Sequence, residues 1–124
     1  MEPFEPPARH DRWVICLCAQ WCGVCREWRN LFEQAAAAQP ELRFAWVDVE
    51  DEAAAMGEVD IETFPTVLVA DGDRPLFFGP VQPSAPQFSR LLASLWREGA
   101  ATSGITPEIS GLLHRLAATV LQKP

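Results

Sequence analysis

The apolar positions along the chain form short runs and stripes that predict alternating strands and helices. Residues 13–19 are apolar at every position, which is typical of a strand buried on both faces of a sheet. Apolar side chains then recur at helical spacing through residues 23–38 until Pro40 ends the pattern. We therefore expect a helix there, beginning at Cys22 or Gly23.

The remaining segments continue this alternation. Residues 71–74 read Asp-Gly-Asp-Arg, a turn signal between two apolar runs, and predict a hairpin. The other expected elements are strands at 42–49, 66–70 and 76–78 and helices at 52–56, from residue 84, and at 107–122. The first two strands, joined through a helix, should be parallel and the last two antiparallel. The pattern predicts an α/β fold, a mixed four-stranded sheet flanked by helices.

Composition agrees with one small globular domain. The chain has 124 residues, of which 48% are hydrophobic and 22% are charged, enough for a single core. The longest apolar run is much shorter than the roughly 20 residues of a membrane span, so no membrane insertion is expected. We expect a loose N-terminal arm at 1–11, a domain at 12–97, and a linker with a final helix packed on that domain at 98–124.

The negative net charge of the chain disfavours some classes of binding partner. The formal net charge is −7, and residues 48–62 contain seven acids and no Lys or Arg. Nucleic acid is disfavoured as a partner because phosphate binding needs a basic surface. The acidic segment is either a solvated face or a surface that selects basic or neutral partners.

All four cysteines lie between residues 16 and 25, which indicates one chemical site rather than a disulfide scaffold. Cys22 is expected at the first turn of a helix, where backbone N–H groups and the helix dipole favour a thiolate, the nucleophile of disulfide exchange. Cys25 follows almost one turn later and can attack a mixed disulfide on Cys22. Gly23 leaves the loop between them open to a substrate backbone.

Two other interpretations of the cysteines stay open. The Cys22/Cys25 spacing also fits half a zinc site, for which Cys16 and Cys18 would have to supply the other ligands. Inert burial is the favoured interpretation for Cys16 and Cys18, since free cysteine is often a core residue. We therefore treat these two as auxiliary to the site and expect no metal.

Two motifs carry a family resemblance. Trp21-Cys22-Gly23-Val24-Cys25 follows the buried strand, and Thr63-Phe64-Pro65-Thr66 precedes a strand and a hairpin; together they resemble the thioredoxin family over roughly residues 12–97. The resemblance implies a thioredoxin-like fold with a Cys22–Cys25 redox-active disulfide and no other cofactor. It also implies that Pro65 is a cis-proline facing the cysteines.

The same resemblance implies a surface that binds substrate. Backbone groups beside a cis-proline are free to pair with an extended peptide. A glycine in the last strand lets a substrate chain lie close. The implied substrate-binding residues are Trp21, Gly23, Val24, Phe64, Pro65 and Gly79.

The chain departs from the family pattern at several positions. Gly23-Val24 stands where thioredoxins carry Gly-Pro between the cysteines, and this dipeptide tunes redox poise. Cys16 stands where the family has a buried aspartate that accepts a proton, and a thiol is a poor substitute for that base. The N-terminus is short, and the extra helix at 107–122 is expected to cover the apolar surface that the missing elements would cover.

The function indicated is that of a thiol–disulfide oxidoreductase. Its expected partners are protein disulfides and a thioredoxin-reductase-like electron donor. Because the chain shows no export signal and carries two extra free thiols, a cytoplasmic location is expected. The alternatives are a non-catalytic thioredoxin-fold module that binds a partner and, less favoured, a cysteine-based metal or thiol carrier.

Overall fold

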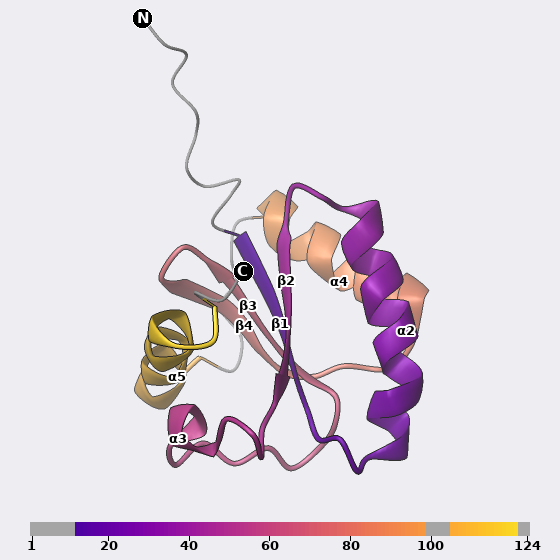
Figure 1. Ribbon diagram of the computed structural model, residues 1–124. Helices are drawn as coiled ribbons and strands as arrows, with labels where there is room; N and C mark the ends of the chain where they lie inside the picture. The colour runs from indigo at the N-terminus through magenta and orange to yellow at the C-terminus, as the bar shows by residue number, and fades with distance from the viewer. Residues whose placement is uncertain (1–11, 99–104, 122–124) are drawn as a thin grey trace, which may run out of the picture.

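The computed structural model describes residues 12–98 and 105–121, and its elements follow the predicted order (Figure 1). Side chains of residues 96–98 are outside this description, as are the expected N-terminal arm and linker. The elements are β1 (Arg12–Cys18), α2 (Gly23–Ala38), β2 (Arg43–Asp48), α3 (Ala53–Met56), β3 (Thr66–Asp71), β4 (Arg74–Pro80), α4 (Ala85–Glu98) and α5 (Pro107–Ala118).

The four described strands form one sheet in the order β2-β1-β3-β4. β1 and β2 are parallel, whereas β3 is antiparallel to both β1 and β4. Gly72 takes the positive φ of 65° in the β3–β4 turn, a conformation that glycine adopts without steric cost. The predicted mixed sheet and its α/β class are confirmed.

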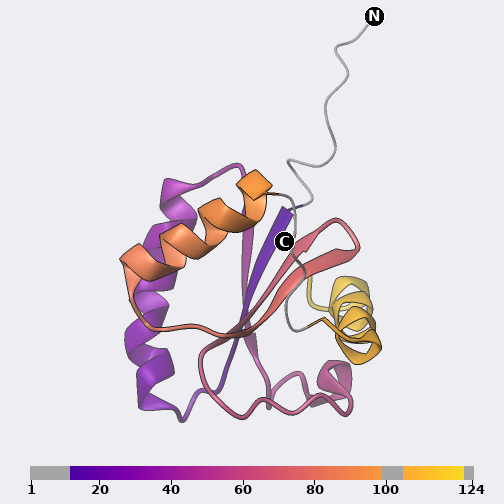
Figure 2. The same cartoon turned by 180° about the vertical axis from the view of Figure 1, so that it is seen from behind.

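Helices cover both faces of the sheet (Figures 1 and 2). α2 and α4 lie on one face, and α3 and α5 lie on the other. Side chains of β1 alternate between the two faces, so Cys16 and Cys18 enter the first core while Ile15 and Leu17 enter the second. The strand is buried on both sides, as its continuous apolar run predicts.

The C-terminal helix α5 packs into the core of the second face. Its hydroxyl cap is Thr106, whose side chain accepts a hydrogen bond from the Ile109 N–H. The helix buries Ile109, Leu112, Leu113 and Leu116. It ends at Ala118 rather than at residue 122, and its Thr119 and Leu121 N–H groups both bond to the Leu116 carbonyl, which closes the last turn.

Candidate redox site

Cys22 lies at the start of α2, at the end of the short loop that follows β1. It is the N-cap residue of α2, with an extended backbone (φ −83°, ψ 121°), and its carbonyl accepts from the Arg26 N–H at 3.1 Å. Its thiol is free and partly exposed. The positive end of the α2 dipole therefore lies beside an accessible sulfur.

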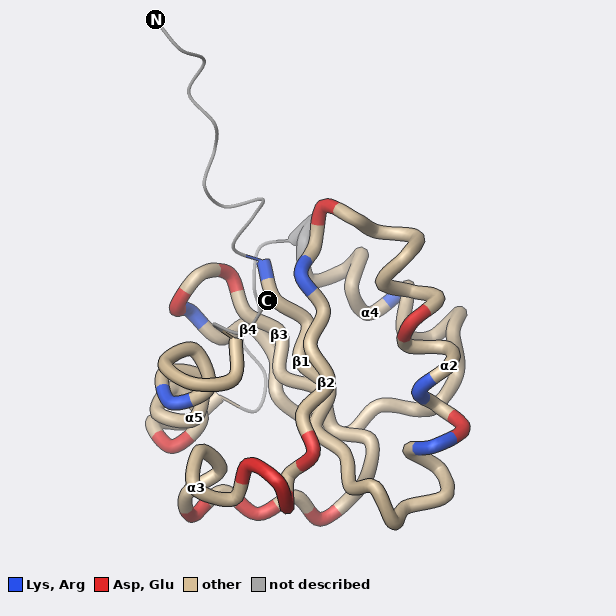
Figure 3. The backbone as a smooth tube through the Cα atoms, viewed as in Figure 1, with Lys and Arg blue, Asp and Glu red and all other residues tan. Residues whose placement is uncertain are grey.

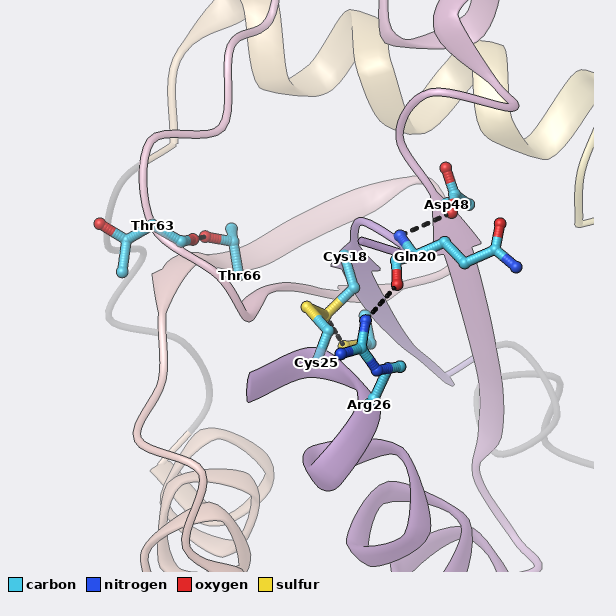
Figure 4. Close-up of a disulfide and its surroundings, with 8 residues drawn as sticks. Cys18, Gln20, Cys25, Arg26, Asp48, Thr63 and Thr66 are labelled. Carbon is cyan, nitrogen blue, oxygen red and sulfur yellow. Dashed lines mark hydrogen bonds between the residues drawn. A yellow bond between two sulfur atoms is a disulfide. The ribbon is translucent and has the colours of Figure 1, made fainter. Parts of the chain in front are cut away.

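The disulfide of the structure joins Cys18 to Cys25, not Cys22 to Cys25 (Figure 4). This corrects the pairing implied by the family resemblance. Cys18 ends β1 on the face that α2 covers, and Cys25 is on the inner side of the first turn of α2. Their Cα atoms are 5.9 Å apart, within the range that a disulfide spans. Cys22, at the rim of the same turn, keeps its thiol.

Cys16 is the second free cysteine, and it lies inside the core. Its Sγ is 3.8 Å from Cys18 Sγ. Burial raises the pKa of Cys16 from 9.0 to about 12, while the Trp28 indole and the Arg29 guanidinium act more weakly in the other direction. At neutral pH it is therefore a neutral thiol that holds its proton, unlike the carboxylate that the family resemblance places here.

Trp28 is buried against this sulfur cluster, and its indole N–H forms no hydrogen bond with a described residue. The ring itself packs edge-on against Phe88, with centroids 5.2 Å apart. Trp28 therefore packs beside the buried cysteines as part of the core.

The surface around Cys22 is apolar and exposed. Trp21 is 62% exposed and Val24 is 43% exposed, and these are the large hydrophobic side chains that stand out on the described surface. Trp21 donates its indole N–H to Glu50 at 2.8 Å and packs edge-on against Phe64 at 5.7 Å between centroids. The Phe64–Pro65 peptide bond is cis. The two predicted motifs therefore meet through Trp21 and Phe64.

A groove runs from these aromatic rings toward α3. It has a volume of about 620 Å³. Its apolar lining includes Trp21, Ile61 and Phe64, and its rim carries acids such as Glu50 and Asp60. The groove adjoins Cys22 through Trp21, so a bound segment would lie close to the free thiol.

Gly79 is not part of that groove. It pairs with Val67 across the β3–β4 ladder and lines a separate hollow of about 270 Å³ together with Thr63 and Thr66. The two cavities share the segment 60–62. The structure thus brings Gly79 near the Phe64–Thr66 segment.

Asp48 is a structural residue of the site that the sequence reasoning counted only as one acid among seven. Its carboxylate accepts from the Gln20 N–H at 3.0 Å and from the Glu50 and Asp51 N–H groups at 2.9 and 3.1 Å. Arg26 in turn donates to the Gln20 carbonyl at 3.0 Å (Figure 4). These bonds fix the loop that carries Cys22. The sequence feature that could have predicted this role is an aspartate at the end of a strand, where its carboxylate can cap the following turn.

Comparisons with known proteins point to one family and one fold. The sequence model of the thioredoxin family matches residues 5–83. The chain is 32% identical over 69 residues to putative thioredoxin 2 of Streptomyces coelicolor, covering 55% of this chain and 52% of that protein. It is 26% identical over 103 residues to protein disulfide isomerase-like 2-3 of rice, covering 82% of this chain and 23% of that protein.

Solved structures show the same fold. Thioredoxin of Fasciola hepatica superposes with a TM-score of 0.62 at 23% identity, over 71% of this chain and 84% of that one. A poplar thioredoxin h gives a TM-score of 0.63 at 17% identity, over 72% and 79%. The chain spans about half the length of the first sequence relative and about a quarter of the second.

Proposed function

Since this chain belongs to the thioredoxin family, we propose that it is a thiol–disulfide oxidoreductase acting on protein disulfides, with Cys22 as nucleophile and Cys25 as resolving cysteine. Family members act on protein disulfides and need no cofactor beyond a redox-active disulfide. The observation that carries the proposal is Cys22 itself. It is a free, partly exposed thiol at the start of α2, beside exposed Trp21 and Val24.

The chemistry starts with Cys25 as a thiol. The Cys22 thiolate attacks one sulfur of a substrate disulfide, forms a mixed disulfide and releases the other substrate sulfur as a thiolate, which is then protonated. Cys25 next loses its proton and attacks the Cys22 sulfur. This releases the second substrate thiolate and leaves both electrons with the substrate.

The proton of Cys25 needs an acceptor other than Cys16, which stays protonated at neutral pH. Cys25 lines a cavity of about 300 Å³ whose wall also includes Asp48 and Glu52. Water in this polar cavity is the acceptor we propose. Resolution by Cys25 is then slower than with a carboxylate beside it.

Partners and compartment belong to the same proposal. An electron donor of the thioredoxin-reductase type would restore the dithiol by the reverse exchange. We place the reaction in the cytoplasm, where thiols such as Cys16 and Cys22 stay reduced. Among the described residues no helix is long and apolar enough to cross a bilayer.

Reduction of insulin disulfides by dithiothreitol tests the proposal. We expect the chain to accelerate it and Cys22→Ser to abolish the acceleration, because serine cannot form the mixed disulfide. Cys22 is outside the disulfide of the structure, so this variant should fold, which far-ultraviolet circular dichroism verifies. Ser110→Ala on the exposed side of α5 is the matched surface control. An unchanged rate in Cys22→Ser contradicts the proposal.

A non-catalytic binding module is the second candidate. The observation that favours it is the engagement of Cys25 with Cys18, together with the absence of a carboxylate at position 16. In that case the Trp21 groove would bind a partner without exchange. Normal partner binding by Cys22→Ser with no insulin reduction by the wild type would identify this function.

A further inference from the structure

Cys25 has two possible sulfur partners. In the structure Cys25 is bonded to Cys18 through a disulfide, and Cys22 lies three residues before Cys25 at the start of the same helix. Residues three apart on a helix are neighbours on its surface. Both Cys18 and Cys22 also pack in the same apolar cluster as Cys25. One sulfur therefore lies between a thiol at the surface and a thiol in the core.

We propose that Cys18 is a third redox-active cysteine, and that Cys25 exchanges its bond between Cys22 at the rim and Cys18 in the core. The inference rests on the proposed oxidoreductase function. It adds a step in which an oxidised Cys22–Cys25 pair passes its disulfide inward and Cys22 becomes a thiol again.

The step balances without an external oxidant. After a substrate disulfide has been reduced, Cys22 and Cys25 share the disulfide. The Cys18 thiolate attacks Cys25 Sγ, the Cys18–Cys25 bond forms, the Cys22–Cys25 bond breaks, and Cys22 leaves as a thiolate. The proton lost by Cys18 is balanced by the proton taken up by Cys22. No electrons enter or leave the protein.

Burial decides which of these cysteines an external thiol can reach. Cys18 is 0% exposed and Cys25 is 1% exposed, so direct attack by an external thiol on either sulfur is strongly hindered. Cys22 is partly exposed and is the route by which a reductant reaches the buried bond. Cys16 lies 3.8 Å from Cys18 on the same face of β1, but it holds its proton at neutral pH and takes no part in the exchange.

The consequence is two oxidised forms with different chemistry. With Cys22–Cys25 closed, the surface carries a disulfide and no accessible thiol. With Cys18–Cys25 closed, the surface carries a single thiol that can form a mixed disulfide which Cys25 cannot resolve. In the form with the Cys18–Cys25 bond, Cys22 is therefore the one cysteine that reacts with a substrate.

Labelling of the oxidised protein tests the partner exchange. The full chain is oxidised with stoichiometric diamide, its free thiols are blocked with a light maleimide, and the disulfide is then reduced and labelled with a heavy maleimide. All four cysteines fall in one tryptic peptide, residues 13–26, so fragmentation of that peptide locates each label. We expect heavy label on Cys18 and Cys25 and light label on Cys22. Heavy label on Cys22 and Cys25 with Cys18 light overturns the proposal.

Two alanine variants on the same face of β1 sharpen this test. Oxidised Cys18→Ala should lose the light label on Cys22, because only the Cys22–Cys25 bond remains available. Cys16→Ala, the matched control, should label as the wild type does. Retention of the Cys22 label in oxidised Cys18→Ala contradicts the role of Cys18.

The rate at which dithiothreitol opens the disulfide tests the route through Cys22. We expect Cys22→Ser, oxidised at Cys18–Cys25, to be reduced at least about tenfold more slowly than the wild type, because the reductant must then reach a buried sulfur directly. Equal rates overturn the relay. None of these measurements uses a protein substrate, so failure of insulin reduction contradicts the proposed function alone.

Discussion

Four sulfur atoms within ten positions have different surroundings, and these differences decide what each can do. Cys22 is free at the rim, Cys18 and Cys25 share a buried bond, and Cys16 is a protonated thiol in the core. The spacing Cys-x-x-Cys predicts Cys22 and Cys25 as the pair that exchanges with substrate. It contains no information about a third sulfur, which reaches the pair through the packing of β1 against α2.

The Cys16 thiol makes stability fall at high pH. Its pKa is about 12 in the folded chain and about 9.0 when unfolded, so between these values the native state holds more protons. The free energy of unfolding should then decrease as pH rises above 9, by up to about 1.4 kcal/mol per pH unit from this group. Urea unfolding of the oxidised wild type and Cys16→Ala, across this range, should show the steeper decline in the wild type. Parallel curves would contradict the assignment.

Trp21 is an exposed contact residue rather than a core residue. Trp21→Ala should raise the KM for insulin by about tenfold, because a large aromatic side chain contributes strongly to a protein interface. It should lower the free energy of unfolding by no more than about 1 kcal/mol, since one exposed hydrogen bond to Glu50 is lost. The rate with a small aromatic disulfide reagent is the control and should stay near the wild-type value. An unchanged KM for insulin would exclude Trp21 from the substrate surface.

At the scale of elements, α5 is linked to α3 by one side chain. Arg115 donates from Nε to the Ala55 carbonyl at 2.6 Å and from Nη2 to the Met56 carbonyl at 3.2 Å. Both acceptors are at the C-terminal end of α3. Gly57 follows at φ 61°, and a Cβ there would lie 2.8 Å from Arg115 Nη2. The helix that the sequence predicted as a cover therefore also holds α3, which lines the groove beside Trp21.

Loss of this link should cost measurable stability. Arg115→Ala removes the donor of the Ala55 carbonyl and one of the two donors of the Met56 carbonyl, which keeps its bond from the Val59 N–H. We expect the free energy of unfolding to fall by about 1–3 kcal/mol. Arg115→Lys should recover only part of this, because an ammonium cannot reproduce the two-donor geometry. Urea unfolding gives both values. If Arg115→Lys is as stable as the wild type, charge rather than geometry makes the link.

The elements themselves were largely predictable, and the contacts between them were not. Apolar periodicity predicted β1 and α2 within a residue or two, and the glycine turn predicted the β3–β4 hairpin. Cys16 and Cys18 are two residues apart on a strand, so their side chains share one face of the sheet. Periodicity could not show that the first turn of α2 lies within bonding distance of Cys18, because that approach depends on the 19–22 loop and on the Asp48 bonds from another strand.

At the scale of the molecule, negative charge gathers beside the redox site. Figure 3 shows acidic positions around α3 and the neighbouring loops. Glu50, Asp60 and Glu62 line the groove next to Trp21. Among protein disulfides, those flanked by basic residues should therefore be attracted and those flanked by acids repelled.

Substrate charge should then affect the rate in a salt-dependent way. Disulfide-linked peptides with lysine beside the cysteine should show a higher kcat/KM than matched peptides with glutamate, and the ratio should shrink as salt is added. Asp60→Asn combined with Glu62→Gln should reduce this ratio, whereas Asp73→Asn in the β3–β4 turn should leave it unchanged. Equal rates for both peptides at low salt would mean that the acids form only a solvated face.

Because side chains alternate along β1, the cysteine cluster and the packing of α3 with α5 lie on opposite faces of the sheet. All four cysteine sulfurs lie on the α2 side of the sheet, while α3, which lines the groove, packs with α5 on the other side. Mutation on one side can therefore change which proteins are recognised without disturbing electron exchange on the other. The C-terminal helix reaches this groove only through the Arg115 bonds to α3, so a substitution there acts on the groove indirectly and leaves the cysteine cluster in place.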